Sequence, residues 1–286
     1  MDCVMTKLTV TNHNQNIDGF KYIYPVISRR VGGLSIGVNF NINNTCNWRC
    51  IYCQVPQLKL GAAPALDTHL FQQELNDFLV DVLEGDFYER MEIPSHQQRI
   101  KDIAIAGNGE PTSLETLDIA VKMIGDIALE RGVFPNSRFI LITNGSLIHR
   151  TQVKKALMLL DTFNGEVWFK LDSGTVEGRL QLNHSKQSNE IILKNLQISS
   201  RLCLTKIQIC LVDYQNQGLS IKERIGLINL LSDIKDHTTI HEVTVYTLAR
   251  PSMQPEAIDL KCLSSELMQD FAMQIAELGY RVDVII

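Results

Sequence analysis

The sequence predicts an α/β fold in which six consecutive strand–helix units form a parallel sheet. Short apolar segments alternate with longer segments of helical period over about 215 of the 286 residues, a pattern typical of β–α units. The apolar segments are nearly uninterrupted, as in 103–106 (Ile-Ala-Ile-Ala) and 139–142 (Phe-Ile-Leu-Ile), which indicates strands buried on both faces. Six units are too few for a closed eight-stranded barrel, so a partial barrel or an open doubly wound sheet fits.

The expected elements follow one another in a regular order. The strands are expected at 34–42, 102–106, 138–143, 166–171, 205–212 and 242–248. The helices are expected between them, at 66–83, 114–130, 150–160, 189–198 and 221–234. A last helix at 264–278 leads to a short terminal strand at 281–286. Turn-forming residues mark some boundaries, such as Pro-Asn-Ser at 135–137 before the third strand. In either architecture, ligands gather at the carboxyl ends of the strands.

Composition and charge exclude several classes of protein. Hydrophobic residues make up 45% and charged residues 21%, which excludes a disordered chain, a collagen-like repeat and a disulfide-stapled mini-protein. The net charge of −5 argues against a tight non-specific binder of nucleic acid, which usually carries a basic surplus. No apolar run reaches the roughly 18 residues that span a bilayer, and residues 1–10 do not resemble a signal peptide. We therefore expect a cytoplasmic protein.

Three of the seven cysteines lie close together, directly after the first expected strand. Cys46, Cys50 and Cys53 form a CxxxCxxC pattern. A structural zinc site prefers four ligands in two separated pairs, and this sequence has no second CxxC pair. Three thiolates on one short loop suit a [4Fe–4S] cluster in which one iron has no protein ligand, and an open position is what a catalytic metal site needs. The downstream cysteines are isolated and are expected to be buried core thiols: Cys203, Cys210 and Cys262.

A glycine-rich segment follows the second expected strand. Its sequence is Gly107-Asn108-Gly109-Glu110, followed by Pro-Thr. Two glycines allow a backbone to approach a ligand closely, and the Glu110 carboxylate can accept hydrogen bonds from a charged amine. An ordinary turn between a strand and a helix is the alternative, because glycine and asparagine are common in turns.

Taken together, the two motifs resemble those of the radical S-adenosylmethionine (SAM) superfamily. The resemblance extends over residues 34–248 as an ordered set of motifs. It implies a partial parallel (β/α)6 barrel with short extensions at both ends. On this basis we divide the chain into an N-terminal extension (1–33), a core (34–249) and a C-terminal helix and strand (250–286) that pack on the core.

The resemblance also implies which residues hold the cofactors. The three cysteines would hold three irons of a [4Fe–4S] cluster, and the fourth iron would bind the amino and carboxylate groups of SAM. The loop Gly107 to Glu110 would receive the SAM amino group, although Asn108 stands where the usual Gly-Gly-Glu form has a glycine. Tyr52 matches the aromatic position beside adenine. Polar residues at later strand ends are further candidates for SAM contacts: Asn144 and Asp172, with Lys170 as a charge satisfied at the sheet end.

The end of the sixth expected strand suggests a subgroup. Its sequence, Tyr246-Thr-Leu-Ala-Arg250-Pro, resembles the Tyr-Thr-x-x-Arg-Pro ending of enzymes similar to wybutosine (tRNA-imidazoguanosine) synthases and their uncharacterised bacterial relatives. Tyr246 and Arg250 are therefore added to the candidate cofactor-binding residues, and Arg250 could hold a carboxylate or phosphate with its planar fork. The archaeal wybutosine enzymes carry further cysteines upstream of CxxxCxxC for a second cluster, whereas this chain has only Cys3 there.

The resemblance implies a reaction in which the reduced cluster cleaves SAM to methionine and a 5′-deoxyadenosyl radical, which abstracts a hydrogen atom from the substrate. The sequence contains no flavodoxin-like domain, so an external one-electron reductant of the flavodoxin or ferredoxin type is expected. No catalytic residue is expected beyond the cluster and SAM. The substrate stays open between a tRNA base, a peptide side chain and a small metabolite. A non-enzymatic iron–sulfur or zinc module is the alternative from a different class, although an electron carrier would not need the Gly109-Glu110 loop.

Overall fold

The protein is described by a computed structural model, which covers residues 19–28 and 32–286. Its centre is an eight-stranded sheet in the order β1-β2-β5-β6-β7-β8-β10-β12. The neighbours from β2 to β12 are paired in parallel, and only β1 (Ile23–Ser28) is antiparallel to its neighbour. β1 and β12 are not paired with each other in this part of the chain, so the predicted partial barrel of parallel strands is confirmed.

The parallel strands agree with the six predicted core strands and with the predicted terminal strand. They are β2 (Gly33–Val38), β5 (Ile100–Ile105), β6 (Arg138–Thr143), β7 (Glu166–Lys170), β8 (Leu204–Cys210), β10 (Val243–Tyr246) and β12 (Val282–Ile285). β2 ends earlier than predicted, because the Asn39 side chain accepts hydrogen bonds from the backbone N–H groups of Asn41 and Asn108 and turns the chain. Two small two-stranded sheets lie outside the main one: β3 (Thr45–Cys46) with β4 (Lys59–Leu60), and β9 (Val212–Tyr214) with β11 (Leu260–Cys262).

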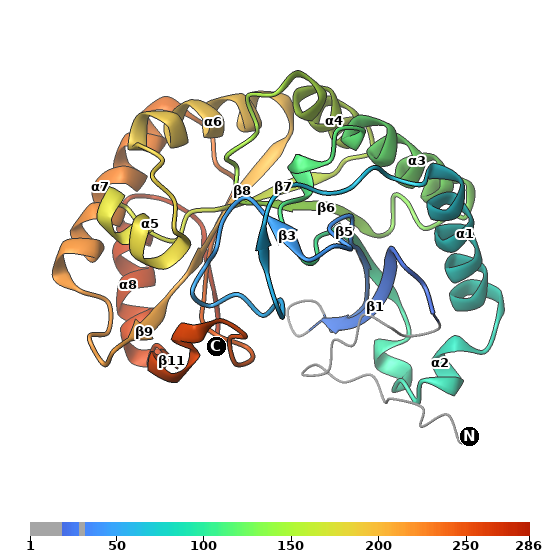
Figure 1. The fold of residues 1–286 in the computed structure, drawn as a ribbon, viewed down its shortest axis with the longest axis horizontal. Helices are drawn as coiled ribbons and strands as arrows, with labels where there is room; N and C mark the ends of the chain where they lie inside the picture. The colour runs from blue at the N-terminus through green and yellow to red at the C-terminus, as the bar shows by residue number, and fades with distance from the viewer. Residues whose placement is uncertain (1–18, 29–31) are drawn as a thin grey trace.

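The helices form an arc outside the curved sheet (Figure 1). They are α1 (Thr68–Glu84), α2 (Phe87–Arg90), α3 (Leu117–Glu130), α4 (Thr151–Thr162), α5 (Val176–Asn183), α6 (Asn189–Leu202), α7 (Ile221–His237) and α8 (Ser265–Glu277). Several begin where a short polar side chain accepts a backbone N–H of the first turn, as Asp67 does for α1 and Ser264 for α8. None of the helices in the described ranges is long and apolar enough to cross a membrane.

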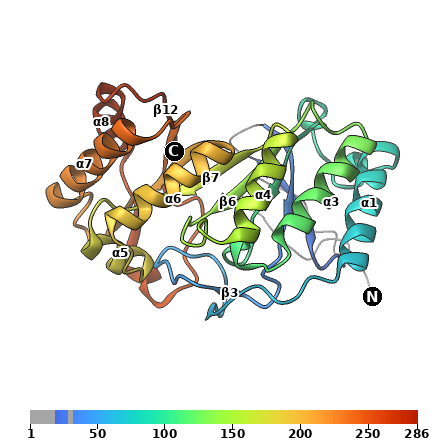
Figure 2. The same ribbon diagram turned by 90° about the horizontal axis from the view of Figure 1, so that it is seen from above.

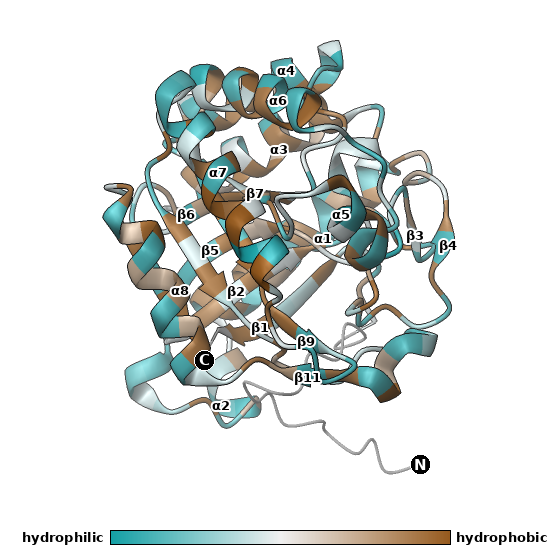
Figure 3. Ribbon diagram, turned by 90° about the vertical axis from the view of Figure 1, so that its left-hand side faces the viewer, coloured by the Kyte–Doolittle hydropathy of each residue, from teal (hydrophilic) through white to brown (hydrophobic). Residues whose placement is uncertain are grey.

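The main hydrophobic core lies between the sheet and these helices. One helix face supplies buried residues at helical spacing, as Leu117, Val121 and Ile124 do on α3. Figure 3 shows the corresponding pattern, with largely hydrophobic strands and helices that alternate between hydrophobic and hydrophilic residues. Two smaller clusters lie apart from the main core, and one of them, on the opposite face of the sheet, contains Ile140 and Trp168. The sheet is therefore buried on both faces, as the uninterrupted apolar strands predict.

The two ends of the sheet differ in chemistry. At the amino ends of the strands, Lys206 pairs with Glu166 (Nζ–Oε2 3.0 Å) and with Glu242 (Nζ–Oε1 3.7 Å), and Arg281 pairs with Glu242 at 3.1 Å. This ion-pair network lies at the amino ends of β7, β8, β10 and β12. The carboxyl ends are covered by the long connection after β2, which carries β3 and lies on the same side of the molecule as α5 (Figure 2).

The prediction for Cys262 is wrong. Its side chain is exposed, because it lies in the short surface strand β11, whereas Cys203 and Cys210 are buried as predicted. Cys3 lies outside the described residues.

Candidate active site

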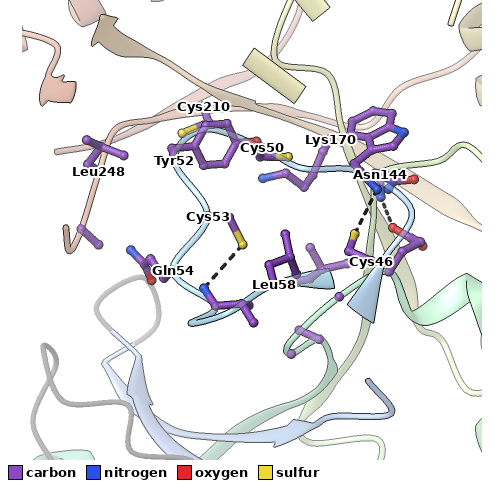
Figure 4. Close-up of a pocket in the computed structure, with 18 of the residues that line it drawn as sticks. Cys46, Cys50, Tyr52, Cys53, Gln54, Leu58, Asn144, Lys170, Cys210 and Leu248 are labelled. Carbon is purple, nitrogen blue, oxygen red and sulfur yellow. Dashed lines mark hydrogen bonds between the residues drawn. The ribbon is translucent and has the colours of Figure 1, made fainter. Parts of the chain in front are cut away.

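The three cysteines of the CxxxCxxC motif line one cavity at the carboxyl ends of the strands. The cavity has a volume of about 340 Å³. Figure 4 shows the sulfurs of Cys46, Cys50 and Cys53 around this space, together with side chains from the ends of β6, β7 and β8. The cysteines reach it because the connection after β2 folds back over the sheet, where β3 and β4 pair in parallel.

Each of these sulfurs accepts one N–H group. The backbone N–H of Trp48 lies 3.4 Å from the sulfur of Cys46, and that of Val55 lies 3.5 Å from the sulfur of Cys53. The sulfur of Cys50 instead accepts from a distant side chain, the amide of Asn183, at 3.3 Å. Such donors stabilise negative charge on sulfur and suit metal-bound thiolates.

Burial opposes ionisation of these thiols in the absence of a metal. It raises the pKa of Cys46 to about 12, with a contribution from Glu110, and the pKa of Cys50 to about 11, with a contribution from Asp172. Burial also raises the pKa of Cys53. Loading the site must therefore displace protons from the thiols, as is usual for thiolate ligands.

The donor set fits an iron–sulfur cluster better than a single zinc ion. All three thiols are free of disulfides. The described ranges contain no group of three or more His, Cys, Asp or Glu residues placed to hold one metal ion. A tetrahedral zinc ion would need its sulfurs about 3.8 Å apart, whereas the thiolates of a cluster bind different irons and stand further apart.

The glycine-rich loop after β5 packs directly against the cysteine loop. A side chain at Gly109 would place its Cβ 1.9 Å from the backbone oxygen of Thr45, so only glycine fits there. Gly107 and Gly109 line the cavity. Asn108 points elsewhere, because its amide donates to Asn44 at 2.8 Å, and it does not line the cavity.

The Glu110 carboxylate joins the ends of β5 and β6. One oxygen accepts from the hydroxyl groups of Thr112 and Thr143, both at 2.5 Å, and from the backbone N–H of Thr112 at 3.1 Å. The other accepts from the backbone N–H of Asn144 at 2.7 Å. Burial raises the pKa of Glu110, while these hydrogen bonds lower it. The carboxylate thus holds two strand ends together, and its contact with a ligand amine stays a prediction.

Asp172 is buried behind the cavity wall and does not line it. Its oxygens accept from the Tyr52 hydroxyl, from the Asn183 amide at 2.9 Å and from the backbone N–H of Cys210 at 3.0 Å. Burial, with Asp172 beside it, raises the pKa of Tyr52. The carboxylate predicted to contact SAM therefore orients the residues that surround it.

Lys170, two residues earlier on β7, lines the cavity instead. Its ammonium donates to the Tyr246 hydroxyl at 2.7 Å and lies over the rings of Tyr52 and Tyr246, at 5.0 Å and 5.4 Å from their centroids. Burial alone would lower the pKa of Lys170, but the electrostatic effect of the neighbouring Tyr246 and Asp172 is larger. The pKa of Lys170 is therefore well above its usual value. The cavity therefore contains a buried cation at the level of the cysteines.

The remaining predicted residues all reach the cavity. Tyr52, Asn144, Tyr246 and Arg250 are among its lining residues. Asn144 is held in place, because its amide nitrogen donates to Asn47 at 2.9 Å and its oxygen accepts from Ser146 at 2.7 Å. Apolar side chains complete the wall: Trp48, Val55, Leu58, Ile142, Leu248 and Ile285.

A segment after β10 holds the cysteine loop from outside, and among its residues the sequence motifs mark only Arg250. In this segment, residues 250–256, the Ser252 hydroxyl donates to the backbone oxygen of Ile51 at 2.7 Å, and the Met253 N–H donates to that of Cys53 at 2.9 Å. Arg49 of the loop forms a two-point ion pair with Glu256, at 2.5 Å and 2.9 Å. The partners are about 200 residues apart in sequence, so local patterns carry no signal for them.

A family model described as the radical SAM superfamily matches residues 40–218. Among curated proteins, a "UPF0026 protein" of Helicobacter pylori is 26% identical over 238 residues, which are 80% of this chain and 66% of that protein. A "GTPase Obg" of Brachyspira hyodysenteriae is 32% identical over 156 residues, 54% of this chain and 19% of that protein. The chain thus spans less than two thirds of the length of either relative.

Solved structures share the fold at low sequence identity. A radical SAM methyltransferase from Sphaerobacter thermophilus matches with a TM-score of 0.59 and 14% identity, over 92% of this chain and 68% of that one. Streptococcus suis SuiB bound to its precursor peptide SuiA matches with a TM-score of 0.57 and 13% identity, over 88% and 49% of the two chains.

Proposed function

Because the chain belongs to the radical SAM superfamily, whose members are enzymes of radical chemistry, we propose that Cys46, Cys50 and Cys53 hold a [4Fe–4S] cluster beside a SAM-binding cavity. The observation that carries this assignment is that the three thiols and the Gly107–Glu110 loop border the same cavity. When bound, the cluster would supply the electron for reductive cleavage of SAM to methionine and a 5′-deoxyadenosyl radical, and this radical would abstract hydrogen from the substrate.

We propose that different residues around the cavity bind different parts of SAM. We assign the SAM amino group to the backbone of Gly107 and Gly109, because both residues line the cavity that also contains the three cysteines. The charged Lys170 suits the SAM carboxylate, because an ammonium buried among aromatic rings favours an anionic partner. Tyr52 and Asn144 are assigned to the nucleoside part.

The apolar side of the cavity would protect the radical. Leu58, Ile142 and Leu248 are among the side chains that line it without offering a hydroxyl or an acidic proton. Exclusion of water from such a site prevents side reactions of a reactive intermediate.

The substrate is unidentified. A second candidate is a tRNA-modifying enzyme similar to wybutosine synthases, and it is favoured by the Tyr246–Pro251 motif, whose residues Tyr246, Thr247 and Arg250 line the cavity. The net charge of −5 counts against a polyanionic substrate unless a local basic surface compensates. We propose that an external carrier of the flavodoxin or ferredoxin type supplies the electron. We also propose that the protein is located in the cytoplasm, whose reducing conditions keep the thiols free.

The test is to purify the protein without oxygen, load it with iron and sulfide, reduce it, add SAM and measure 5′-deoxyadenosine. Slow formation of this nucleoside is expected in the wild type and no formation in Cys50→Ala. Cys203→Ala is the matched control, because Cys203 is a buried thiol that bonds to the backbone oxygen of Gly165 away from the cavity. Binding of zinc without iron would contradict the proposal and leave a structural metal module.

A further inference from the structure

Asn183 supplies the only side-chain hydrogen bond from outside the cysteine loop to a motif sulfur within the described ranges. Its amide nitrogen lies 3.3 Å from the sulfur of Cys50, although the two residues are 133 positions apart. Cys46 and Cys53 receive backbone N–H groups from residues two positions further along their own loop. The Cys50 contact therefore depends on the identity of one distant side chain.

The direction of the Asn183 amide is determined by its surroundings. The same nitrogen donates to a carboxylate oxygen of Asp172 at 2.9 Å, and an ionised carboxylate can only accept. Asp172 is itself held by the backbone N–H of Cys210. The amide oxygen of Asn183 is buried without a hydrogen-bond partner among the residues described, so all of the polar contacts of this side chain are made through the nitrogen that faces Cys50.

The backbone holds the two partners together as well. Asn183 ends α5, and its carbonyl oxygen accepts from the backbone N–H of Arg49 at 3.2 Å. The carbonyl of Leu182 accepts from the backbone N–H of Ile51 at 2.8 Å. The residues on both sides of Cys50 thus dock on the end of α5, and the Asn183 side chain is fully buried beneath them.

We propose that Asn183 is a positioning residue that donates an N–H···S hydrogen bond to the Cys50 thiolate in the loaded enzyme and makes the cluster easier to reduce. The inference rests on the proposed function, because it requires a cluster at Cys50. Reduction adds one electron, and part of the added negative charge resides on the thiolate sulfurs. A donor aimed at one of these sulfurs stabilises the reduced form more than the oxidised form, and hydrogen bonds to sulfur are among the determinants of cluster potential.

The experiment compares Asn183→Leu and Asn183→Ala with the wild type. Neither replacement side chain can donate a hydrogen bond, and the smaller alanine provides the measurement if leucine does not fit. Asn195→Leu is the matched control, because Asn195 is an equally buried amide on α6 that donates to the backbone oxygen of Gly145 at 2.9 Å rather than to sulfur. The measurements are iron per protein and the midpoint potential, from a dithionite titration without SAM followed by electron paramagnetic resonance.

We expect unchanged iron content and a lower midpoint potential in both Asn183 variants. At a given solution potential, the ratio of reduced to oxidised cluster should fall about tenfold, which is about 59 mV for a one-electron couple. The proposal is overturned if the potential equals that of the wild type, or if Asn195→Leu shifts it by the same amount. Loss of iron in both Asn183 variants would also overturn it, since Asn183 would then be needed for assembly. A wild type that takes up no cluster would instead contradict the proposed function, and this inference with it.

Discussion

Glu110 is a single buried side chain whose contacts connect the fold with the candidate site. Its carboxylate accepts two hydrogen bonds from Thr112 of its own loop and two from Thr143 and Asn144 at the end of β6, so it ties the loop after β5 to the end of β6. The sequence motif alone suggests only that this carboxylate faces a ligand. The structure assigns it a second task, because the position of Asn144 beside the cavity follows from the Glu110 contact.

Glu110→Gln should weaken both stability and SAM binding. The variant keeps the shape of the side chain but replaces an acceptor oxygen by an NH2 group that faces donors, and we expect a loss of about 2 kcal/mol in the free energy of unfolding. We also expect SAM affinity, measured by calorimetry on the loaded protein, to fall about tenfold. Glu74→Gln is the control, because Glu74 is a buried carboxylate on α1 that accepts the backbone N–H groups of Lys21 and Tyr22 away from the cavity. Equal SAM affinity in Glu110→Gln and the wild type would contradict a role of this loop in binding.

Gly109→Ala should separate the two loops that form the site. The added Cβ would lie 1.9 Å from the Thr45 backbone oxygen, a contact that only a backbone shift can relieve. We expect iron content after reconstitution to fall at least severalfold, because the cysteine loop must move away. Gly61→Ala lies in the same long connection and meets no atom closer than 3.4 Å, so it should load normally. Normal loading of both variants would show that the loops do not need this contact.

At the scale of elements, the 250–256 segment decides how the cysteine loop is held from outside. Its Ser252 and Met253 contacts are neutral hydrogen bonds, whereas Glu256 adds an ion pair with Arg49. The hydrogen bond from Arg49 lowers the pKa of Glu256 below its ordinary value of 4.5. The contact therefore contributes stability above about pH 4.5, and this stability is lost as the pH falls through the lowered pKa.

Glu256→Gln should consequently be more destabilising at neutral pH than in acid. Because both partners are partly exposed, we expect a loss of about 1 kcal/mol near pH 7 and a smaller difference from the wild type near pH 3. Urea unfolding at both pH values measures the difference. A loss of the same size at the lower pH would mean that packing of the side chain, rather than its charge, holds the loop.

The elements also show which local patterns suffice for prediction. β6 (Arg138–Thr143) has the predicted bounds, because an apolar run between turn residues marks both of its ends. α5 was not predicted, because its eight residues include Gly178 and polar side chains and lack a clear apolar period. Yet α5 carries Asn183 and docks the cysteine loop. An element whose stability comes from tertiary contacts leaves a weak trace in the sequence.

At the scale of the whole molecule, the two ends of the barrel have separate tasks. The carboxyl ends of the strands carry the cavity, and the amino ends carry the ion-pair network of Lys206, Glu166 and Glu242. Since the cavity and the network lie at opposite ends of the strands, a change in the network should alter stability without altering cofactor binding.

Lys206→Met tests this separation. It leaves two carboxylates facing each other without their shared buried cation, and we expect a loss of about 3 kcal/mol in the free energy of unfolding. Iron content and SAM affinity should stay at the wild-type values when measured well below the melting temperature. Lys122→Met, which breaks an exposed pair with Asp126 on α3, should cost less than about 1 kcal/mol. Reduced iron uptake in folded Lys206→Met would show that the two ends are coupled.

The amino-acid sequence alone is enough to predict the β–α order, the parallel sheet and the position of the three cysteines after the first core strand. These features are encoded locally, in hydrophobic period and in short spacings, so neighbouring residues suffice to recognise them. Three features of the site become visible only in the folded chain: Lys170 rather than Asp172 faces the cavity, Asn183 reaches Cys50, and residues 250–256 hold the cysteine loop. These contacts join residues far apart in the chain, and each polar side chain involved looks like an ordinary strand-end or turn residue until folding brings the strand ends together.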